Sequence, residues 1–205
     1  MNFNNIVKHY EECLDKYGDN HLGVNWNSEE SANIRYQIMI ELIKCGDNKN
    51  ISLLDFGCGT SALYSYIVEK KIKNIKYYGL DISKKFIELS RQKFSQNNYY
   101  CLDILKDNFD NSFDYIICNG VFTCKHDLSF ENMLSLWEET LVKLFEKADI
   151  GIAFNVMSKY VDWENKSLFH LPIDYMLDFV TKNLSRNFII RSDYKLFEYT
   201  TYIYK

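Results

Sequence analysis

The 205-residue sequence has only one proline and eight glycines, and it contains no proline-rich or serine-rich linker. It has no apolar run of the roughly 20 residues that a membrane-spanning helix needs. The first residues, Met1–Asn5, do not begin a signal peptide. We therefore expect a cytoplasmic protein with one main domain and an N-terminal extension, and we expect no membrane partner.

Basic residues are not in excess either. The chain has 24 Lys and Arg against 28 Asp and Glu, a formal net charge of −4. A protein that binds nucleic acid usually carries a basic stripe. The single lysine cluster, Lys70–Lys73, is typical of a solvated helix end. Composition therefore argues against a nucleic-acid partner.

The six cysteines include no C-x-x-C pair, and no Cys/His cluster has the spacing of zinc ligands. We therefore expect no metal site. Cys101 and Cys118 fall within apolar strands and are interpreted as small core residues. This use of cysteine is typical of a reducing compartment, in agreement with a cytoplasmic location.

The most informative segment that is present runs from Leu53 to Thr60. An apolar strand leads into Asp55 and then into the turn Gly57-Cys58-Gly59, and a helical pattern starts at Ser61. Doubly wound α/β domains form their nucleotide crevice in this way. The glycines let the backbone turn sharply and approach a ligand closely. A carboxylate at the mouth of the turn would repel a pyrophosphate and attract a cation.

Two further predicted strands, about 75–80 and 98–102, end at Asp81 and Asp103. Three successive strands thus end in carboxylates, at the edge where open α/β sheets bind ligands. An acid-lined crevice suits S-adenosylmethionine (SAM), which combines ribose hydroxyls and an adenine amine with a sulfonium and an ammonium.

These residues resemble the class I SAM-dependent methyltransferases. Asp55–Thr60 is similar to the first motif of that family, and Asp81 matches the acid that binds the ribose hydroxyls. Asp103 with Ile104 matches the pair beside the adenine, and residues 113–119 match the fourth strand and its turn. One departure is Ser61, where a third glycine is common. The resemblance implies SAM as cofactor and S-adenosylhomocysteine as product.

The resemblance also implies an α/β fold, a Rossmann-like sheet of seven strands in the order 3-2-1-4-5-7-6 with the last antiparallel. Residues 1–48 would form an N-terminal helical lid, and residues 49–205 the SAM-binding domain. The strands are predicted at about 51–55, 75–80, 98–102, 113–118, 150–156, 188–191 and 197–204. Helices are predicted at about 3–17, 28–46, 61–71, 83–94, 129–147 and 172–183, with Ser28 and Ser83 as N-caps of the second and fourth.

The predicted cofactor-binding residues are Trp26, Arg35, Asp55, Gly57, Cys58, Gly59, Asp81, Ile82, Asp103, Ile104 and Asn119. In several small-molecule members of the family a lid arginine pairs with the methionine carboxylate, and Arg35 is the candidate here. Its alternative is a surface salt bridge with Glu30 or Glu41. Asn119 would offer its backbone carbonyl to the ammonium, or serve as a plain turn residue.

Two histidines are candidates for catalysis. His126 follows the fourth strand and could act as a general base, because the ordinary pKa of histidine is close to the operating pH. The neighbouring Lys125 instead suggests anion binding, and an exposed loop residue is the simplest alternative. His170 precedes the helix at 172–183 and would face the methyl acceptor.

The sequence therefore predicts methyl transfer from SAM to a small molecule, with oxygen preferred to nitrogen as the acceptor atom, by a monomer or homodimer. A weaker resemblance to methyltransferases of bacterial surface-polysaccharide clusters implies a sugar or phosphoryl-type acceptor in capsule modification. The alternatives are a non-catalytic SAM-binding protein, an RNA or protein methyltransferase, and NAD binding through Gly57-x-Gly59-x-x-Ala62. The acids could also be mere helix caps.

Overall fold

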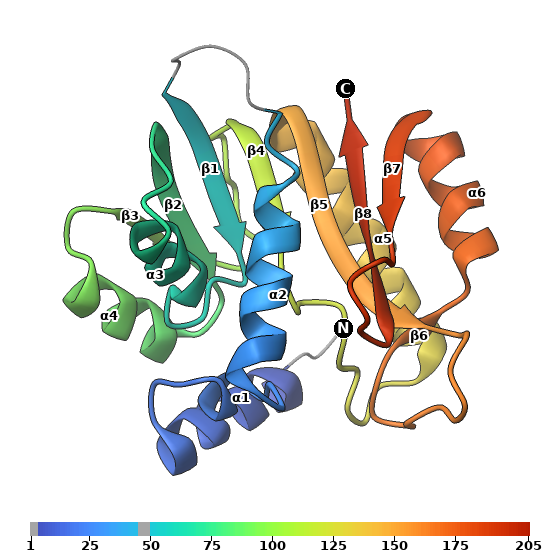
Figure 1. Ribbon diagram of the computed structural model, residues 1–205, viewed down its shortest axis with the longest axis horizontal. Coiled ribbons are helices and arrows are strands. Elements are labelled where there is room, and N and C mark those ends of the chain that lie inside the picture. Colours follow the sequence, from blue (N-terminus) through green and yellow to red (C-terminus); the bar gives the residue numbers. More distant parts are fainter. Residues whose placement is uncertain (1–3, 45–49) are drawn as a thin grey trace.

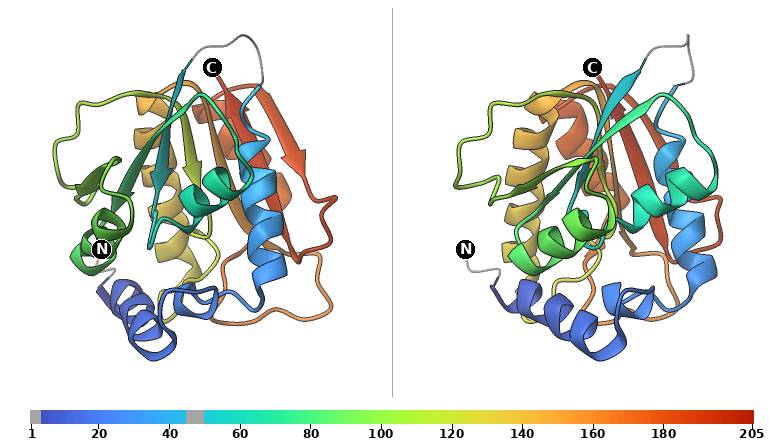
Figure 2. Two further views of the ribbon diagram at one scale, coloured as in Figure 1. Left: turned by 60° about the vertical axis from the view of Figure 1, so that its left-hand side comes forward. Right: turned by 90° about the vertical axis from the view of Figure 1, so that its left-hand side faces the viewer.

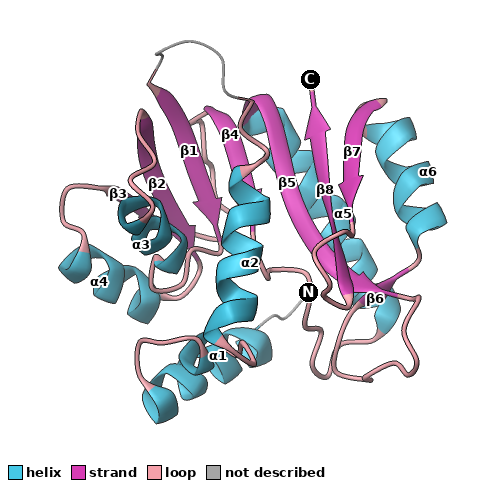
Figure 3. Ribbon diagram, in the orientation of Figure 1, coloured by secondary structure: helices cyan, strands magenta, loops and turns pink. Residues whose placement is uncertain are grey.

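The computed structural model describes residues 4–44 and 50–205, and its centre is one mixed β-sheet (Figures 1 and 3). The strand order is β3-β2-β1-β4-β5-β8-β7, with the short β6 paired to β5 off this path. Only β8 runs antiparallel to its neighbours β5 and β7. The strands are β1 (Ile51–Phe56), β2 (Ile75–Asp81), β3 (Asn98–Cys101), β4 (Phe113–Cys118), β5 (Ala148–Ser158), β6 (His170–Leu171), β7 (Asn187–Arg191) and β8 (Glu198–Tyr204).

The predicted order of the seven principal strands is confirmed, with β7 and β8 as the closing antiparallel hairpin. The one addition is β6, which pairs His170 and Leu171 with Met157 and Ser158 at the end of β5. Two residues carry no periodic pattern, so the sequence had no signal for this strand.

Helices cover both faces of the sheet, as the turned views in Figure 2 show. On one face, α2 (Glu29–Ile40), α3 (Ala62–Glu69) and α4 (Lys84–Lys93) bury residues such as Met39 and Leu63 against β1 and β2. On the other face, α5 (Phe130–Lys147) and α6 (Ile173–Asn183) pack around the fully buried Trp137. Apolar surface removed from water on both faces stabilises this three-layer arrangement.

Serine side chains start α2 and α4 as predicted. Ser28 Oγ accepts a hydrogen bond from the Ser31 N–H at 3.1 Å, and Ser83 Oγ accepts from the Phe86 N–H at 3.3 Å. Each bond satisfies one of the free amides at a helix N-terminus. The second helix was predicted to end near Gly46, but α2 ends at Ile40, with Glu41 as its C-cap. The predicted domain boundary at residue 48 lies outside the described residues, so the division into two parts stays a prediction.

The N-terminal helix α1 (Asn4–Tyr17) and the short 3-10 helix η1 (Leu22–Val24) lie across the edge of the sheet where the parallel strands end (Figure 2). Polar contacts fasten this segment to α4. Lys93 Nζ lies 2.6 Å from Asp19 Oδ2, Lys85 pairs with Asp15, and the Ser83 hydroxyl donates to Glu11. The segment therefore covers the edge at which a ligand would bind.

The two cysteines that were expected in the core differ. Cys118 is fully buried in β4, whereas Cys101 is exposed, so that the prediction for Cys101 was wrong. Cys101 is the last residue of β3, which is the outermost strand on its side of the sheet and has a neighbour on one edge only. In the part of the chain that the structure describes, none of the helices has the length and apolar character that a membrane span requires.

Candidate functional site

A cavity of about 190 Å³ lies between the C-terminal ends of the parallel strands and the segment α1–η1 that covers them. Its walls are the turn after β1, the end of β2 and the turn after β4, while α1, η1 and α2 close it from outside. The lining residues are Ile6, Val7, Tyr10, Val24, Trp26, Tyr36, Asp55, Gly57, Cys58, Gly59, Thr60, Ala62, Leu63, Asp81, Ile82, Ser83, Phe86, Asn119, Gly120 and Val121.

The turn after β1 needs its glycines. Gly57 and Gly59 have φ values of 72° and 51°, in the left-handed region that side chains disfavour. A Cβ on Gly57 would lie 2.6 Å from Val121 Cγ2. The amides of Gly57 and Cys58 both donate to the carbonyl of Leu80, at 2.8 and 3.0 Å, and so fix the turn to β2.

Ser61, at the position where a third glycine is common, also has a left-handed backbone, with φ of 60°. Such a conformation costs a residue with a side chain about 1–2 kcal/mol. Ser61 is fully buried, and its hydroxyl lies 2.9 Å from Ser90 Oγ and 3.2 Å from Tyr99 Oη. These hydrogen bonds offset the strain, so the departure from the glycine pattern leaves the turn intact.

Asp55 lies at the floor of the cavity and is only 3% exposed. Its Oδ2 accepts a hydrogen bond from the Tyr77 hydroxyl at 2.7 Å. Burial raises the pKa of Asp55 to about 7; the Tyr77 bond opposes this rise, and the nearby Asp81 adds to it. In the free protein this carboxyl therefore gains and loses its proton near neutral pH.

Asp81 holds the glycine turn from the end of β2. Its Oδ2 accepts from the Gly59 N–H and its Oδ1 from the Ser83 N–H, each at 2.9 Å. Removal from water raises the pKa of Asp81, and the hydrogen bonds from backbone amides oppose that rise. Because each carboxylate oxygen can accept a second donor, Asp81 keeps capacity for hydroxyl groups of a ligand.

The cavity presents negative and neutral groups to a ligand. Of its described lining residues, Asp55 and Asp81 are acidic, and none is Lys, Arg or His. Asn119 Oδ1 is buried without a hydrogen-bond partner, which makes it an acceptor ready for a donor. Among the described residues, no group of three or more His, Cys, Asp and Glu side chains could hold a metal ion. The chemistry of the site therefore favours a cationic ligand with several donors.

Comparison with known proteins agrees with this geometry. Residues 54–144 match a family model described as a methyltransferase domain. The matched segment is under half of the chain, and the strand order is that of the Rossmann-like methyltransferase fold. Magnesium protoporphyrin IX methyltransferase from Synechocystis PCC 6803, solved with bound SAM, has the same fold, with a TM-score of 0.67 at 17% identity over 100% of this chain and 98% of that one.

Two curated relatives are named malonyl-[acyl-carrier protein] O-methyltransferase. The protein from Acetivibrio thermocellus is 26% identical over 92 residues, which cover 44% of this chain and 32% of that protein. The one from Priestia megaterium is 28% identical over 122 residues, which cover 58% of this chain and 39% of that protein. The matches therefore span between about a third and two fifths of the length of these relatives.

Most of the predicted cofactor-binding residues come together in this cavity. The structure places Trp26, Asp55, Gly57, Cys58, Gly59, Asp81, Ile82 and Asn119 in its lining. Arg35, Asp103 and Ile104 lie outside it. The roles of all these residues toward a cofactor stay predictions.

The three residues outside the lining are engaged elsewhere. Arg35 pairs with Glu198 of β8, and not with Glu30 or Glu41. Asp103 accepts from the Leu105 N–H at 3.0 Å and pairs with Lys106, while Ile104 is buried in the hydrophobic core.

Sequence reasoning missed the apolar side of the cavity. The outer side of the cavity is lined by Ile6, Val7 and Tyr10 of α1 and by Val24 of η1. The helical spacing of the α1 residues predicted an apolar face, but spacing alone does not say which surface such a face covers.

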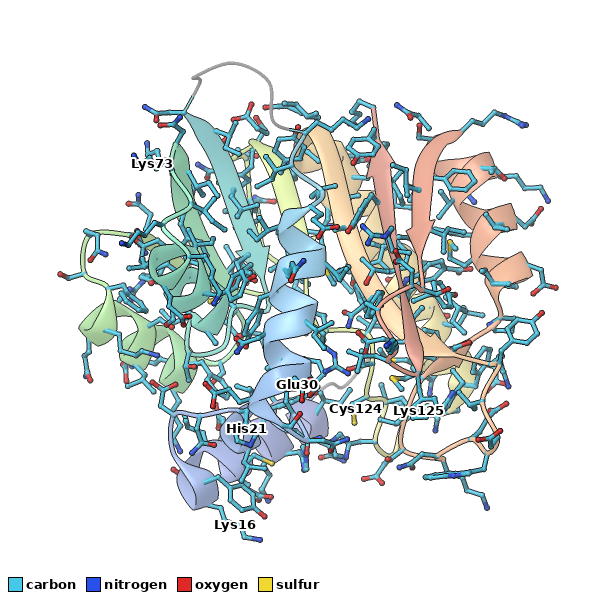
Figure 4. The ribbon with its side chains drawn as sticks, in the orientation of Figure 1. Lys16, His21, Glu30, Lys73, Cys124 and Lys125 are labelled. Atoms are coloured by element: carbon cyan, nitrogen blue, oxygen red, sulfur yellow. The ribbon has the colours of Figure 1, made fainter. Side chains whose placement is uncertain are left out.

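The candidate base His126 lies in the loop after β4, next to Cys124 and Lys125, which Figure 4 shows near α1. Its ring contacts that of His9 of α1, with centroids 3.9 Å apart and planes tilted by 57°, and its Nε2 is buried without a partner. Burial, and then the charge of His9, lowers the pKa of His126. His126 does not line the cavity, and its catalytic role stays a prediction.

His170, the second candidate, is buried and uses both ring nitrogens within the protein. Nδ1 lies 2.6 Å from the Ser158 carbonyl, and Nε2 accepts from the Asn165 N–H at 3.3 Å when the proton is on Nδ1. These contacts join the end of β5 to β6. Its predicted role toward the acceptor is untested, and the contacts give it a structural task.

We expect His170→Gln to lower the free energy of unfolding by about 1–3 kcal/mol, because a buried donor or acceptor is then left unpaired. Urea denaturation measures this loss, and SAM affinity of the folded variant should stay at the wild-type value. His21→Gln, on the N-terminal segment, is the control. A His170→Gln protein of normal stability that fails to turn over would assign His170 to catalysis instead.

Proposed function

We propose that this chain transfers the methyl group of SAM to a small-molecule acceptor, with an oxygen atom preferred. The observation that carries the proposal is the charge of the glycine-walled cavity. Asp55 and Asp81 face into it, Asn119 offers an unpartnered oxygen, and its described lining holds no basic side chain. A donor with ammonium and sulfonium groups and ribose hydroxyls complements all three features.

The residues of the cavity bind, orient and exclude water. When bound, SAM supplies an activated methyl group on its sulfonium. Asp81 would accept hydrogen bonds from the ribose hydroxyls, while Asp55 and Asn119 favour the cationic end. Val7 and Tyr10 of α1 keep water from the reacting atoms. Alignment of an acceptor in such a closed site accounts for much of the rate that methyl transfer needs.

The same charges argue against NAD. The pyrophosphate of a dinucleotide would lie at the glycine turn, close to Asp55 and Asp81. The two phosphates and the two carboxylates would together bring four negative charges to this site. No Lys or Arg among the described lining residues could neutralise them. Like charges at such separations repel strongly inside a protein.

The lining of the cavity supports a small acceptor, and the names of the relatives support oxygen as the acceptor atom. The outer wall is apolar, with Ile6, Val7, Tyr10 and Val24, and suits an acceptor with an apolar body. The curated relatives are named O-methyltransferases. None of the proteins cited above is named for a polysaccharide acceptor, so the expectation of capsule modification has no support.

An RNA or protein acceptor is less favourable. The formal net charge of the chain is −4, and the three lysines that Figure 4 labels, Lys16, Lys73 and Lys125, lie at separate parts of the molecule. A macromolecular anion would need a basic face.

Calorimetry with SAM, S-adenosylhomocysteine and NAD tests the cofactor, and turnover of SAM with a panel of carboxylic acids, phenols, alcohols and amines tests the reaction. We expect binding of SAM and its product, no binding of NAD, and S-adenosylhomocysteine formation with an oxygen acceptor. SAM binding without turnover on any acceptor would favour the non-catalytic alternative. Tight NAD binding without SAM binding would overturn the proposal.

A further inference from the structure

Two charged residues outside the cavity, Arg35 of α2 and Glu198 of β8, form a buried ion pair. Arg35 Nε lies 3.0 Å from both carboxylate oxygens of Glu198, and Nη2 lies 2.8 Å from Oε2. The side chains are 11% and 1% exposed. Arg35 Nη1 also donates to the Ser31 carbonyl at 3.1 Å. The geometry of the guanidinium is thus fixed from two sides.

The pair continues into the wall of the cavity. Glu198 Oε1 also accepts from Asn155 Nδ2 at 3.0 Å, and Asn155 Oδ1 accepts from the Gly120 N–H at 2.8 Å. Asn155 is fully buried in β5. Gly120 follows Asn119 in the turn after β4 and lines the cavity. An unbroken chain of hydrogen bonds therefore runs from α2 to this turn.

Trp26 closes the chain into a ring of contacts. The Arg35 guanidinium carbon lies 4.1 Å from the centroid of the Trp26 ring. The far edge of that ring packs on Gly120, where a Cβ would lie only 2.6 Å from Trp26 Cζ2. Trp26, Arg35, Glu198, Asn155 and Gly120 thus form one network, in which Asn155 and Glu198 are buried and the other three are half-buried. Trp26 and Gly120 are its two members in the cavity wall.

Stability alone does not account for such a network. Removing two charges from water costs free energy, and replacing a buried ion pair by apolar residues is often neutral or stabilising. The pair does fix the distance between α2 and β8 and the orientation of the Arg35 side chain, because the guanidinium presents its donors in a rigid planar fork. The two cavity residues that the ion pair fixes, Trp26 and Gly120, lie beside Asn119, whose side-chain oxygen has no hydrogen-bond partner.

We propose that Arg35 and Glu198 are positioning residues, which hold Trp26 and the Asn119–Gly120 turn in the arrangement that binds the methionine end of SAM. This inference rests on the proposed function. It differs from the predicted direct contact of Arg35 with the cofactor, because the guanidinium is already hydrogen-bonded to Glu198.

Glu198→Gln tests the inference, since it keeps the shape and the Asn155 contact but removes the charge that holds Arg35. We expect SAM to bind at least tenfold more weakly, measured by calorimetry. In a Trp163→Phe background, where the fully buried Trp137 is the other emitter and should stay constant, the Trp26 emission should also move to longer wavelength as the ring loses its fixed neighbours. The matched control is Glu41→Gln, which breaks the Arg191–Glu41 pair between α2 and β7, away from the cavity. It should leave both readouts unchanged.

The double variant Arg35→Met, Glu198→Gln separates positioning from folding. Glu198→Gln leaves the Arg35 charge without its partner, whereas the double variant removes both charges. The thermal stability of the double variant should therefore be closer to wild type, while its SAM affinity stays low. Recovery of affinity together with stability would overturn the inference, as would unchanged or tighter SAM binding by Glu198→Gln. Tighter binding would favour the direct role of Arg35. Wild-type protein that binds no SAM would overturn the proposed function, and an unshifted Trp26 emission in Glu198→Gln would then overturn the positioning role as well.

Discussion

Asp81→Asn should weaken SAM binding by about 100-fold or more. Hydrogen bonds to a charged group contribute about 1.5–3 kcal/mol each, and the proposed site uses Asp81 for two ribose hydroxyls. The Gly59 and Ser83 N–H groups donate to different oxygens of Asp81, and in asparagine one of these two positions is an NH2 group that cannot accept. The substitution therefore affects both the ligand contact and the turn that surrounds it.

Calorimetric titration with SAM measures this loss, and Asp103→Asn is its matched control at the end of the neighbouring strand. The Asp103 carboxylate is engaged locally by Leu105 and Lys106, so its substitution should change SAM affinity by less than about threefold. Equal losses for the two variants would show that Asp103 also contacts the cofactor, as the family resemblance implies.

The affinity for SAM should fall steeply as the pH drops below 7. Asp55 has its pKa raised to about 7, and its proton must leave before the carboxylate can face the cationic donor. Linkage of one proton gives a limiting slope of about tenfold per pH unit, or about 25-fold between pH 7.5 and 5.5. The raised pKa of Asp81 acts in the same direction. Burial also raises the pKa values of Tyr77, Cys58 and Cys118, so these neighbours stay neutral over this range.

Asp55→Asn should bind SAM weakly and lose most of this pH dependence. Asp114→Asn, which affects a carboxylate bound to Ser52 at the opposite end of the strands, should keep the wild-type profile. In the absence of SAM, the contribution of Asp55 to folding stability should instead increase as the pH falls. Because the folded pKa of Asp55 lies above its unfolded value, its stabilising contribution is complete below about pH 4 and is lost as the pH rises through 7. Between pH 6 and 8 the melting temperature of the wild-type protein should therefore fall more than that of Asp55→Asn. Equal pH dependence of the two melting temperatures would contradict the assignment.

The sequence was most informative where the signal is local. The strand that ends at Asp55, the turn through Gly57 and Gly59, and the serine that starts α4 are each encoded within a few neighbouring residues. Parallel strands then bring their carboxyl ends to one edge, and so Asp55 and Asp81 could be placed together before the structure was known.

The contacts that could not be predicted join distant parts of the chain. Arg35 and Glu198 are 163 residues apart, and two acids nearer in sequence, Glu30 and Glu41, offered plausible partners. Only the position of β8 between β5 and β7 brings Glu198 beneath α2. The exposure of Cys101 likewise depends on the place of its strand at the border of the sheet, which an apolar pattern does not reveal.

The way α1 closes the cavity has a consequence for the pace of the reaction. Ile6, Val7 and Tyr10 of α1 line the outer side of the cavity of about 190 Å³, so movement of this helix would widen the way in for a ligand. Its fastenings to α4 are partly exposed pairs such as Lys93–Asp19, and not a deep apolar joint. In the proposed reaction, movement of this helix would help to set how fast donor and product exchange, and we expect turnover to respond to substitutions at these pairs.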